Sequence, residues 1–246
     1  MGDLKQENHS NHQDNIWRHF QNRHPEVFEG AAARMDYIVR EIIRKKTTAF
    51  PRVLNIGAGN GHLEERGAQL GWEIYSLDPD EGAVNRLLKK GIRAYRGYME
   101  GMPFADDSFD FVVASEVLEH LNAQQLHEGL REAVRVMRRG AWFIGTVPHC
   151  ENLTLNEVVC PKCQEVFHRW GHQRSFDLQT MRGELLSFFD QAVVKRRGFV
   201  AFRGRSWRGK IKSLVRSILA RYGAPIAMPN IYFAARKQRD IPSRQN

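Results

Sequence analysis

Long apolar runs are missing from this chain of 246 residues. The longest, such as AWFIGTV at 141–147, fall far short of the roughly 20 residues that a helix needs to cross a bilayer. The N-terminal segment MGDLKQENHSNHQDN is polar and lacks the apolar core of a secretory signal. Gln6 also stands where the myristoylation pattern requires Ser or Thr. We therefore expect a cytoplasmic protein.

Cysteine is scarce, with only three in the chain. Cys160 and Cys163 form a C-x2-C pair, but no thioredoxin-like βαβ context surrounds it, which argues against a redox couple. His168 and His172 follow, giving the spacing C-x2-C-x4-H-x3-H. Two thiolates and two imidazoles can fill the tetrahedral shell of a structural zinc ion. The alternative is a buried cysteine pair with two unrelated histidines nearby. Cys150 has no obvious partner and is expected to be a free thiol.

Acidic residues are absent from the stretch between Gln191 and Arg239, which holds thirteen Lys or Arg, so the net charge of +9 belongs to the C-terminal quarter. Within it, SWRGKIKSLVRSILARY predicts a basic amphipathic helix. Its apolar stripe consists of Trp207, Ile211, Leu214, Val215, Ile218, Leu219 and Tyr222. The stripe can pack on the protein core, lie on an anionic membrane surface such as the inner membrane, or bring its cations to RNA phosphates.

A glycine-rich turn is the most informative feature that is present. The segment VLNIGAGNG at 53–61 is an apolar strand pattern that enters Gly57, Gly59 and Gly61, and a helix-like stretch follows. Glycines let the backbone approach a ligand where a Cβ would clash, so a nucleotide-like cofactor is the natural occupant, although such turns also serve simple packing. The next strand pattern ends in Asp78, 17 residues after Gly61, where a carboxylate can bind a ribose diol.

Strand and helix patterns alternate along the chain and predict an α/β fold, with helices on both faces of a parallel sheet. The expected strands lie at about 53–57, 73–77, 92–95, 109–115 and 141–147, and apolar runs at 192–202 and 230–237 complete the sheet. We divide the chain into an N-terminal helical region (1–50), a cofactor-binding core (51–148), a zinc-binding insertion (149–176) and the remainder of the core with the basic helix (177–246).

Three motifs in order, VLNIGAGNG, LDPD and MEGMPFADDSFDFVVASEVLEHL, resemble the class I S-adenosylmethionine-dependent methyltransferases over about residues 50–148. The resemblance implies a Rossmann-like sheet of seven strands, the last one antiparallel. Its cofactor-binding residues would correspond here to Asn55, Gly57, Ala58, Gly59 and Gly61 at the methionine end, Asp78 at the ribose, Met99 and Glu100 at the adenine, and Ser115 and Glu116 under the methyl group. Many relatives carry an acidic residue in place of Asn55, whose amide offers no charge to the cofactor's ammonium.

The stretch CPKCQEVFHRWGHQRSF resembles an insertion, CP-x-C followed by FH-x-W-x-H-x-R-SF, in some bacterial members of this family. Members of this group are generally suspected of acting on envelope glycans or other small molecules. The insertion follows the fifth strand, at the side of the sheet where open α/β folds bind ligands, so it could cover the acceptor pocket.

The expected reaction is attack by an acceptor oxygen or nitrogen on the sulfonium methyl group. His120, just beyond the fourth strand, and His149, at the end of the fifth, are the candidate general bases. We expect a small acceptor, such as a glycan or a lipid-linked molecule. The alternative is an RNA methyltransferase, or an RNA-binding protein on a methyltransferase scaffold, because the first three zinc ligands also fit the spacing of nucleic-acid-binding zinc knuckles.

Overall fold

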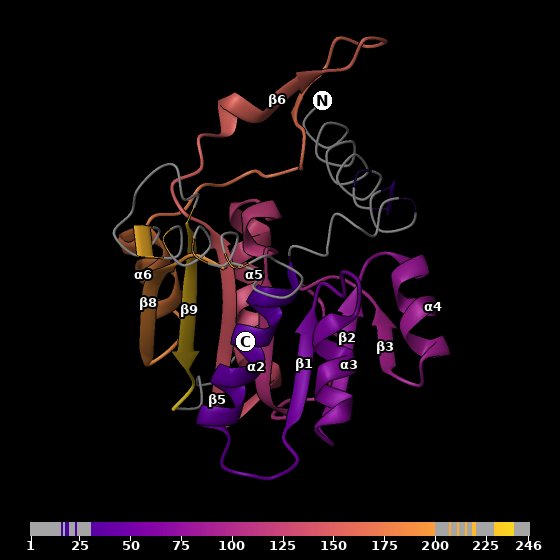
Figure 1. Cartoon of the computed structure of the whole chain (residues 1–246), viewed down its shortest axis with the longest axis vertical. Helices are drawn as coiled ribbons and strands as arrows, with labels where there is room; N and C mark the ends of the chain where they lie inside the picture. The colour runs from indigo at the N-terminus through magenta and orange to yellow at the C-terminus, as the bar shows by residue number, and fades with distance from the viewer. Residues whose placement is uncertain are drawn as a thin grey trace, which may run out of the picture.

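A seven-stranded sheet forms the centre of the computed structural model, which describes residues 31–199 and 229–238 and the single positions 16, 18, 19, 23, 207, 211, 215, 218 and 219. The strands lie in the order β3-β2-β1-β4-β5-β9-β8 (Figure 1). They are β1 (Arg52–Ile56), β2 (Glu73–Asp78), β3 (Arg93–Arg96), β4 (Phe109–Ser115), β5 (Met137–Pro148), β8 (Gln191–Arg197) and β9 (Asn230–Arg236).

The pairing of the strands confirms the predicted Rossmann-like sheet. β1 to β5 pair with one another in parallel, whereas β9 is antiparallel to both β5 and β8. β5 begins four residues earlier than expected, because Met137 pairs with Phe109 before the register shifts at the next pairs. All seven strands were located by their apolar patterns.

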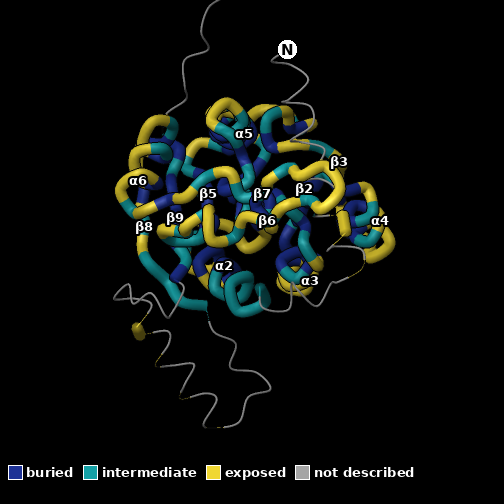
Figure 2. The backbone as a smooth tube through the Cα atoms, turned by 90° about the horizontal axis from the view of Figure 1, so that it is seen from above, coloured by how far each residue is buried: buried dark blue, intermediate teal, exposed yellow. Residues whose placement is uncertain are grey.

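Helices cover both faces of the sheet, as the alternating pattern predicts. On one face, α2 (Ala32–Lys45), α3 (His62–Gln69) and α4 (Glu81–Lys89) enclose one apolar cluster; on the other, α5 (Ala123–Val136) and α6 (Leu178–Leu186) enclose a second. From above, α2 and α5 lie on opposite sides of the buried strands (Figure 2). Each helix turns its apolar residues inward, as Ile38 and Ile42 do in α2 and Leu126 and Leu130 in α5.

The segment 149–176 forms a small unit of its own above the carboxyl ends of the parallel strands (Figure 1). It contains the short 3-10 helix η3 (Leu153–Asn156) and the antiparallel strands β6 (Glu157–Val159) and β7 (Val166–His168), which form a separate two-stranded sheet. A bridge between His149 and Phe176 closes the base of the segment. The hairpin therefore projects from the rim of the sheet where ligands bind in open α/β folds.

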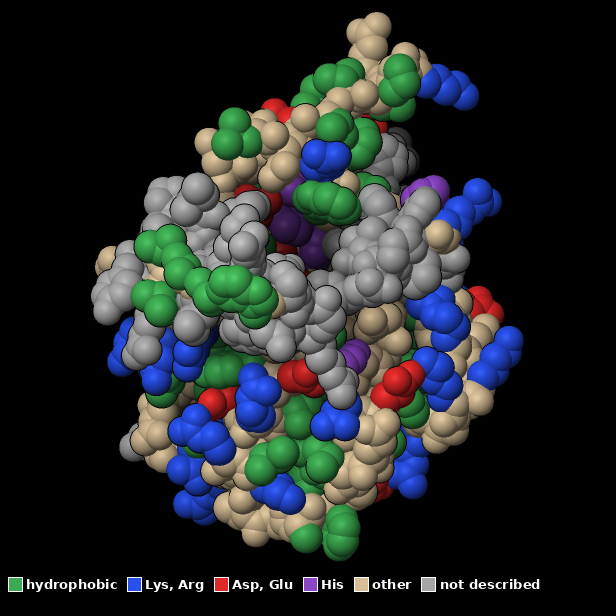
Figure 3. Space-filling view, viewed as in Figure 1, with side chains coloured by type: hydrophobic (Ala, Val, Ile, Leu, Met, Phe, Trp, Pro, Cys, Tyr) green, Lys and Arg blue, Asp and Glu red, His purple; other side chains and the backbone are tan. Residues whose placement is uncertain are grey.

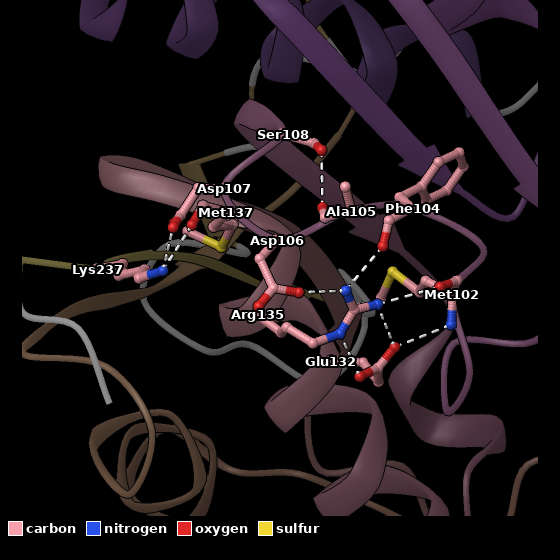
Figure 4. A network of polar contacts seen from close by, with 10 residues as sticks. All are labelled: Met102, Phe104, Ala105, Asp106, Asp107, Ser108, Glu132, Arg135, Met137 and Lys237. Carbon is pink, nitrogen blue, oxygen red and sulfur yellow. Dashed lines mark hydrogen bonds and ion pairs between the residues drawn. The ribbon is translucent and has the colours of Figure 1, made fainter. Parts of the chain in front are cut away.

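The loop after β3 is fixed by a single arginine on α5 (Figure 4). The guanidinium of Arg135 donates hydrogen bonds to the carbonyls of Met102 and Phe104 and to the carboxylates of Asp106 and Glu132. Glu132 in turn accepts from the backbone N–H of Met102 at 3.0 Å. These contacts hold the loop that follows Met99 and Glu100 against the helix.

Most of the predicted basic amphipathic helix lies outside the described residues. Five of its apolar positions are described as helical, and their side chains are 40–67% exposed: Trp207, Ile211, Val215, Ile218 and Leu219. At these positions the stripe is not buried in the core. Among the described residues, no helix is long and apolar enough to span a bilayer.

Candidate functional site

A cavity of about 590 Å³ opens at the carboxyl ends of β1, β2 and β4. Most of the predicted cofactor-binding residues line it: Asn55, Gly57, Ala58, Gly59, Asp78, Met99, Glu100, Ser115 and Glu116. Gly61 stands one turn further on, as the N-cap of α3. The sequence therefore located the cavity wall formed by the core, because parallel strands bring their carboxyl ends to one edge of the sheet.

The glycine turn has the backbone geometry that the sequence predicts. Gly57 and Gly61 have φ angles of 82° and 83°, in the left-handed region that side chains disfavour. A Cβ at Gly57 would lie 3.0 Å from Val117, and one at Gly61 would lie 2.8 Å from Leu87. The turn thus brings the backbone to the cavity with no side chain in between, which is a cradle suited to a nucleotide-like cofactor.

Asp78 ties the glycine turn to the end of β2. Its buried carboxylate accepts hydrogen bonds from the backbone N–H groups of Ala58 at 2.7 Å and Asp80 at 2.8 Å. Asp80 then caps α4 by accepting from Ala83 at 2.7 Å. Because each carboxylate oxygen has two lone pairs, Asp78 can still accept from the hydroxyls of a ribose.

A carboxylate that sequence patterns did not reveal lies behind Asn55. The Asn55 side-chain amide donates at 2.7 Å to Oε1 of Glu64 on α3, and Ser76 donates to the same oxygen at 2.8 Å. Oε2 of Glu64 is buried and has no hydrogen-bond partner among the described residues, and Glu64 lines the cavity. Burial raises the pKa of this carboxyl to about 7. The acidic group absent at position 55 is therefore supplied nine residues later, by the first turn of α3.

The far wall of the cavity is built around the end of β4. Ser115 shares a hydrogen bond of 2.7 Å with Thr146, and Glu116 accepts from Thr146 at 2.9 Å and from Asn230 at 3.1 Å. Arg34 on α2 donates to Ser115 at 3.0 Å and lies 3.8 Å from Glu116. Arg34 gave no signal in the sequence, because only the packing of α2 brings it across 81 positions to the site.

The two predicted bases are placed differently. His120 lines the cavity, and burial followed by the nearby His172 lowers its pKa to about 3, so its imidazole is neutral at neutral pH. His149 is not among the cavity-lining residues, and its Nε2 accepts from Arg196 at 3.1 Å. Of the two candidates, only His120 lines the cavity, and its role as a base stays a prediction.

The four predicted zinc ligands are not brought together. Among the described residues, His168 and His172 form a group of potential metal ligands with Glu151, and neither cysteine belongs to it. The reason lies in the register of the hairpin: His168 pairs with Glu157, three positions from Cys160, or about 10 Å along a strand. The cysteines instead lie at the turn between β6 and β7, so the Cys2His2 set predicted from spacing does not fit a single zinc ion.

The fold and the cavity together are typical of enzymes that bind a nucleotide-like cofactor. Comparisons with known proteins identify the family. Residues 54–145 match the family described as "Methyltransferase domain". The ubiquinone biosynthesis O-methyltransferase of Ruegeria pomeroyi is 32% identical over 200 residues, which cover 72% of this chain and 77% of that protein. The demethylmenaquinone methyltransferase of Chlorobaculum parvum is 33% identical over 93 residues, or 37% of this chain, and the chain spans only 38% of its length.

Solved structures show the same fold at lower identity. A Burkholderia thailandensis 1,6-didemethyltoxoflavin-N1-methyltransferase, with bound 1,6-didemethyltoxoflavin and S-adenosylhomocysteine, superposes with a TM-score of 0.62 at 15% identity, covering 92% of this chain and 87% of that one. The YcgJ protein of Bacillus subtilis gives a TM-score of 0.54 at 18% identity, covering 83% and 99%. The chain belongs to the S-adenosylmethionine-dependent methyltransferases.

Proposed function

We propose that this enzyme transfers the methyl group of S-adenosylmethionine to an oxygen or nitrogen of a small acceptor, in the class of quinone precursors, glycans or lipid-linked molecules. The carrying observation is the cavity, whose cofactor end is the glycine turn and whose other end is walled by Glu116, His120 and Trp170. The names of the bacterial relatives support a small acceptor, since two of them refer to quinones.

The residues at the cofactor end fit S-adenosylmethionine. Asp78 offers acceptor oxygens for the ribose, and Met99, which is buried beneath the cavity, offers an apolar surface for the adenine. Glu64 supplies a buried carboxylate oxygen that no described residue engages, which suits the cofactor's ammonium. When bound, the cofactor supplies a sulfonium methyl group that is already electrophilic. The chain's residues then mainly align the two reactants and exclude water.

The test incubates purified protein with methyl-labelled S-adenosylmethionine and a cell extract separated into lipid, RNA, protein and small-molecule fractions. We expect label in the lipid or small-molecule fraction, lost in Asp78→Ala and kept in Glu65→Gln, whose exposed carboxylate pairs with Lys90 outside the cavity. Label that ribonuclease removes would overturn the proposal in favour of an RNA acceptor, and label confined to protein would overturn it as well.

We further propose that the apolar stripe of the predicted basic helix rests on an anionic membrane surface, close to a lipid-linked acceptor. Its described side chains, which include Trp207 and Ile211, are exposed, and the surrounding sequence carries Lys and Arg with no acidic residue. Sedimentation with vesicles tests this contact. We expect binding to anionic vesicles that is absent with neutral vesicles and weakened in Trp207→Ala. Failure to bind either kind of vesicle would contradict the proposal, and so would equal binding to both kinds.

A further inference from the structure

A cluster of histidine and glutamate side chains lies beside the acceptor end of the cavity. Glu119, His120 and His172 each place one potential metal-ligand atom within 4.8 Å of the other two. His120 and His172 line the cavity, and Figure 3 shows purple histidine and red acidic side chains in a hollow beneath the projecting hairpin. The proposed methyl transfer gives no task to Glu119 or His172.

Backbone hydrogen bonds connect the two chain segments that carry these residues. Glu119 and His120 belong to the 3-10 helix η2 (Leu118–His120), directly after β4, whereas His172 follows the hairpin. The carbonyl of Glu119 accepts from the N–H groups of Gln173 at 2.8 Å and Arg174 at 3.1 Å. The spacing of the three side chains is thus fixed by main-chain contacts between the core and the insertion.

The hydrogen bonds of the two cavity histidines indicate which ring nitrogen carries the proton. Nδ1 of His120 lies 3.2 Å from the carbonyl of Gly171, and a carbonyl only accepts, so Nδ1 carries the proton. Nδ1 of His172 lies 2.5 Å from Oε2 of Glu151, where a carboxylate likewise accepts. In both rings Nε2 is therefore the basic nitrogen. Histidines that bind metals characteristically donate their other N–H to a carbonyl or carboxylate in this way.

His168 shares a second group of potential ligand atoms with Glu151 and His172, beside the group that contains Glu119. Its Nδ1 accepts from the backbone N–H groups of His172 at 3.1 Å and Trp170 at 3.3 Å, which places the proton on Nε2. That nitrogen faces Oε1 of Glu151 at 3.5 Å. It makes no hydrogen bond among the described residues, so Glu151 is fixed by its contact with Nδ1 of His172.

The buried carboxylate of Glu119 is a second, independent indication that a cation binds here. Its side chain is 1% exposed, and within the described part of the chain neither of its carboxylate oxygens has a hydrogen-bond partner. A buried carboxylate without partners is strongly unfavourable unless a cation or proton accompanies it. The nearby Nε2 atoms of the two histidines carry no proton, so they cannot donate a hydrogen bond to this carboxylate. They are, however, good co-ligands for a cation.

We propose that Glu119, His120 and His172 bind a divalent transition-metal ion, with zinc as the first choice, in the wall of the acceptor cavity. Two imidazoles and one carboxylate form a three-ligand set of the kind that leaves a fourth position open on catalytic zinc. Because both histidines line the cavity, that open position faces the acceptor. An acceptor hydroxyl or carbonyl oxygen would bind there. This last role rests on the proposed methyl transfer, whereas metal binding itself does not.

The test is a titration of the metal-free full-length protein with Co²⁺, followed by absorption spectroscopy, and with Zn²⁺, followed by calorimetry, both without S-adenosylmethionine. We expect one metal ion per chain and cobalt spectra without sulfur-to-metal charge-transfer bands. Glu119→Gln and His172→Gln should each weaken binding at least tenfold. Glu151→Gln, which replaces the carboxylate partner of His172 by an uncharged amide, should weaken it by about tenfold to a hundredfold.

Matched controls separate this site from one built on the cysteines. The double variant Cys160→Ser, Cys163→Ser should bind cobalt as the unaltered protein does. Thiolate bands in the cobalt spectrum, loss of binding in the cysteine variant, or unchanged affinity in Glu119→Gln would each overturn the proposal, as would no binding at all. Circular dichroism and S-adenosylmethionine affinity check that each variant is folded. A protein that binds metal but transfers no methyl group would contradict only the proposed function.

Discussion

Replacing Glu64 by Gln is expected to stabilise the protein while weakening cofactor binding. Burial raises the pKa of the Glu64 carboxyl from its ordinary value of 4.5 to about 7 in the folded protein. Because the folded state holds this proton more tightly than the unfolded state, ionisation of Glu64 lowers the free energy of unfolding as pH rises from about 4.5 to 7. The difference amounts to about 3 kcal/mol above pH 7, at about 1.4 kcal/mol per pH unit.

A glutamine avoids this cost of ionisation, and its side-chain oxygen can still accept from Asn55 and Ser76. At pH 8, Glu64→Gln should therefore raise Tm by about 6–12 °C, at about 2–4 °C per kcal/mol for a chain of this size. The gain should vanish well below pH 4.5, where the carboxyl is protonated in both states. S-adenosylmethionine should bind about tenfold to a hundredfold more weakly, because a charge-assisted hydrogen bond is lost.

The assays are thermal unfolding at several pH values and calorimetric titration with S-adenosylmethionine. The matched control is Glu65→Gln, the neighbouring exposed residue, which pairs with Lys90 and does not line the cavity. It should change neither quantity appreciably. The reasoning would be refuted by a Glu64→Gln variant that is less stable than the unaltered protein at pH 8 and binds the cofactor with the same affinity.

Three further changes test other parts of the site. In the unaltered protein, affinity for S-adenosylmethionine should rise as pH increases through about 7, since a bound ammonium favours the ionised Glu64; titrations at pH 6 and 8 should show no such rise in Glu64→Gln. Arg135→Ala removes the contacts that hold the loop at Met102 and Phe104, so hydrogen exchange there should accelerate and cofactor affinity should fall several-fold. Gly57→Ala places a Cβ 3.0 Å from Val117 at a positive φ, so it should lower Tm by several degrees. The control is Gly101→Ala, whose Cβ would meet no described atom within 4 Å and which should leave Tm unchanged.

The core of the fold and most of the cofactor site follow from the sequence, because both depend on local patterns. Apolar strand patterns and the glycine turn specify neighbouring elements a few residues apart, and the carboxyl ends of parallel strands meet at one edge of a sheet. Asp78 could therefore be assigned to the cavity from these patterns, whereas Met99 and Glu116 were assigned to it through the family resemblance.

Tertiary structure decided what depends on packing between distant segments. Spacing grouped His168 and His172 with the cysteines, but the register of the hairpin sends Cys160 and Cys163 to the turn and leaves the histidines beside Glu151. Arg34 reaches Ser115 only through the packing of α2 on the sheet, and Glu64 reaches Asn55 only because α3 folds back over β1. Sequence spacing limits how far apart two residues can lie along the chain, whereas burial and backbone pairing determine which side chains meet.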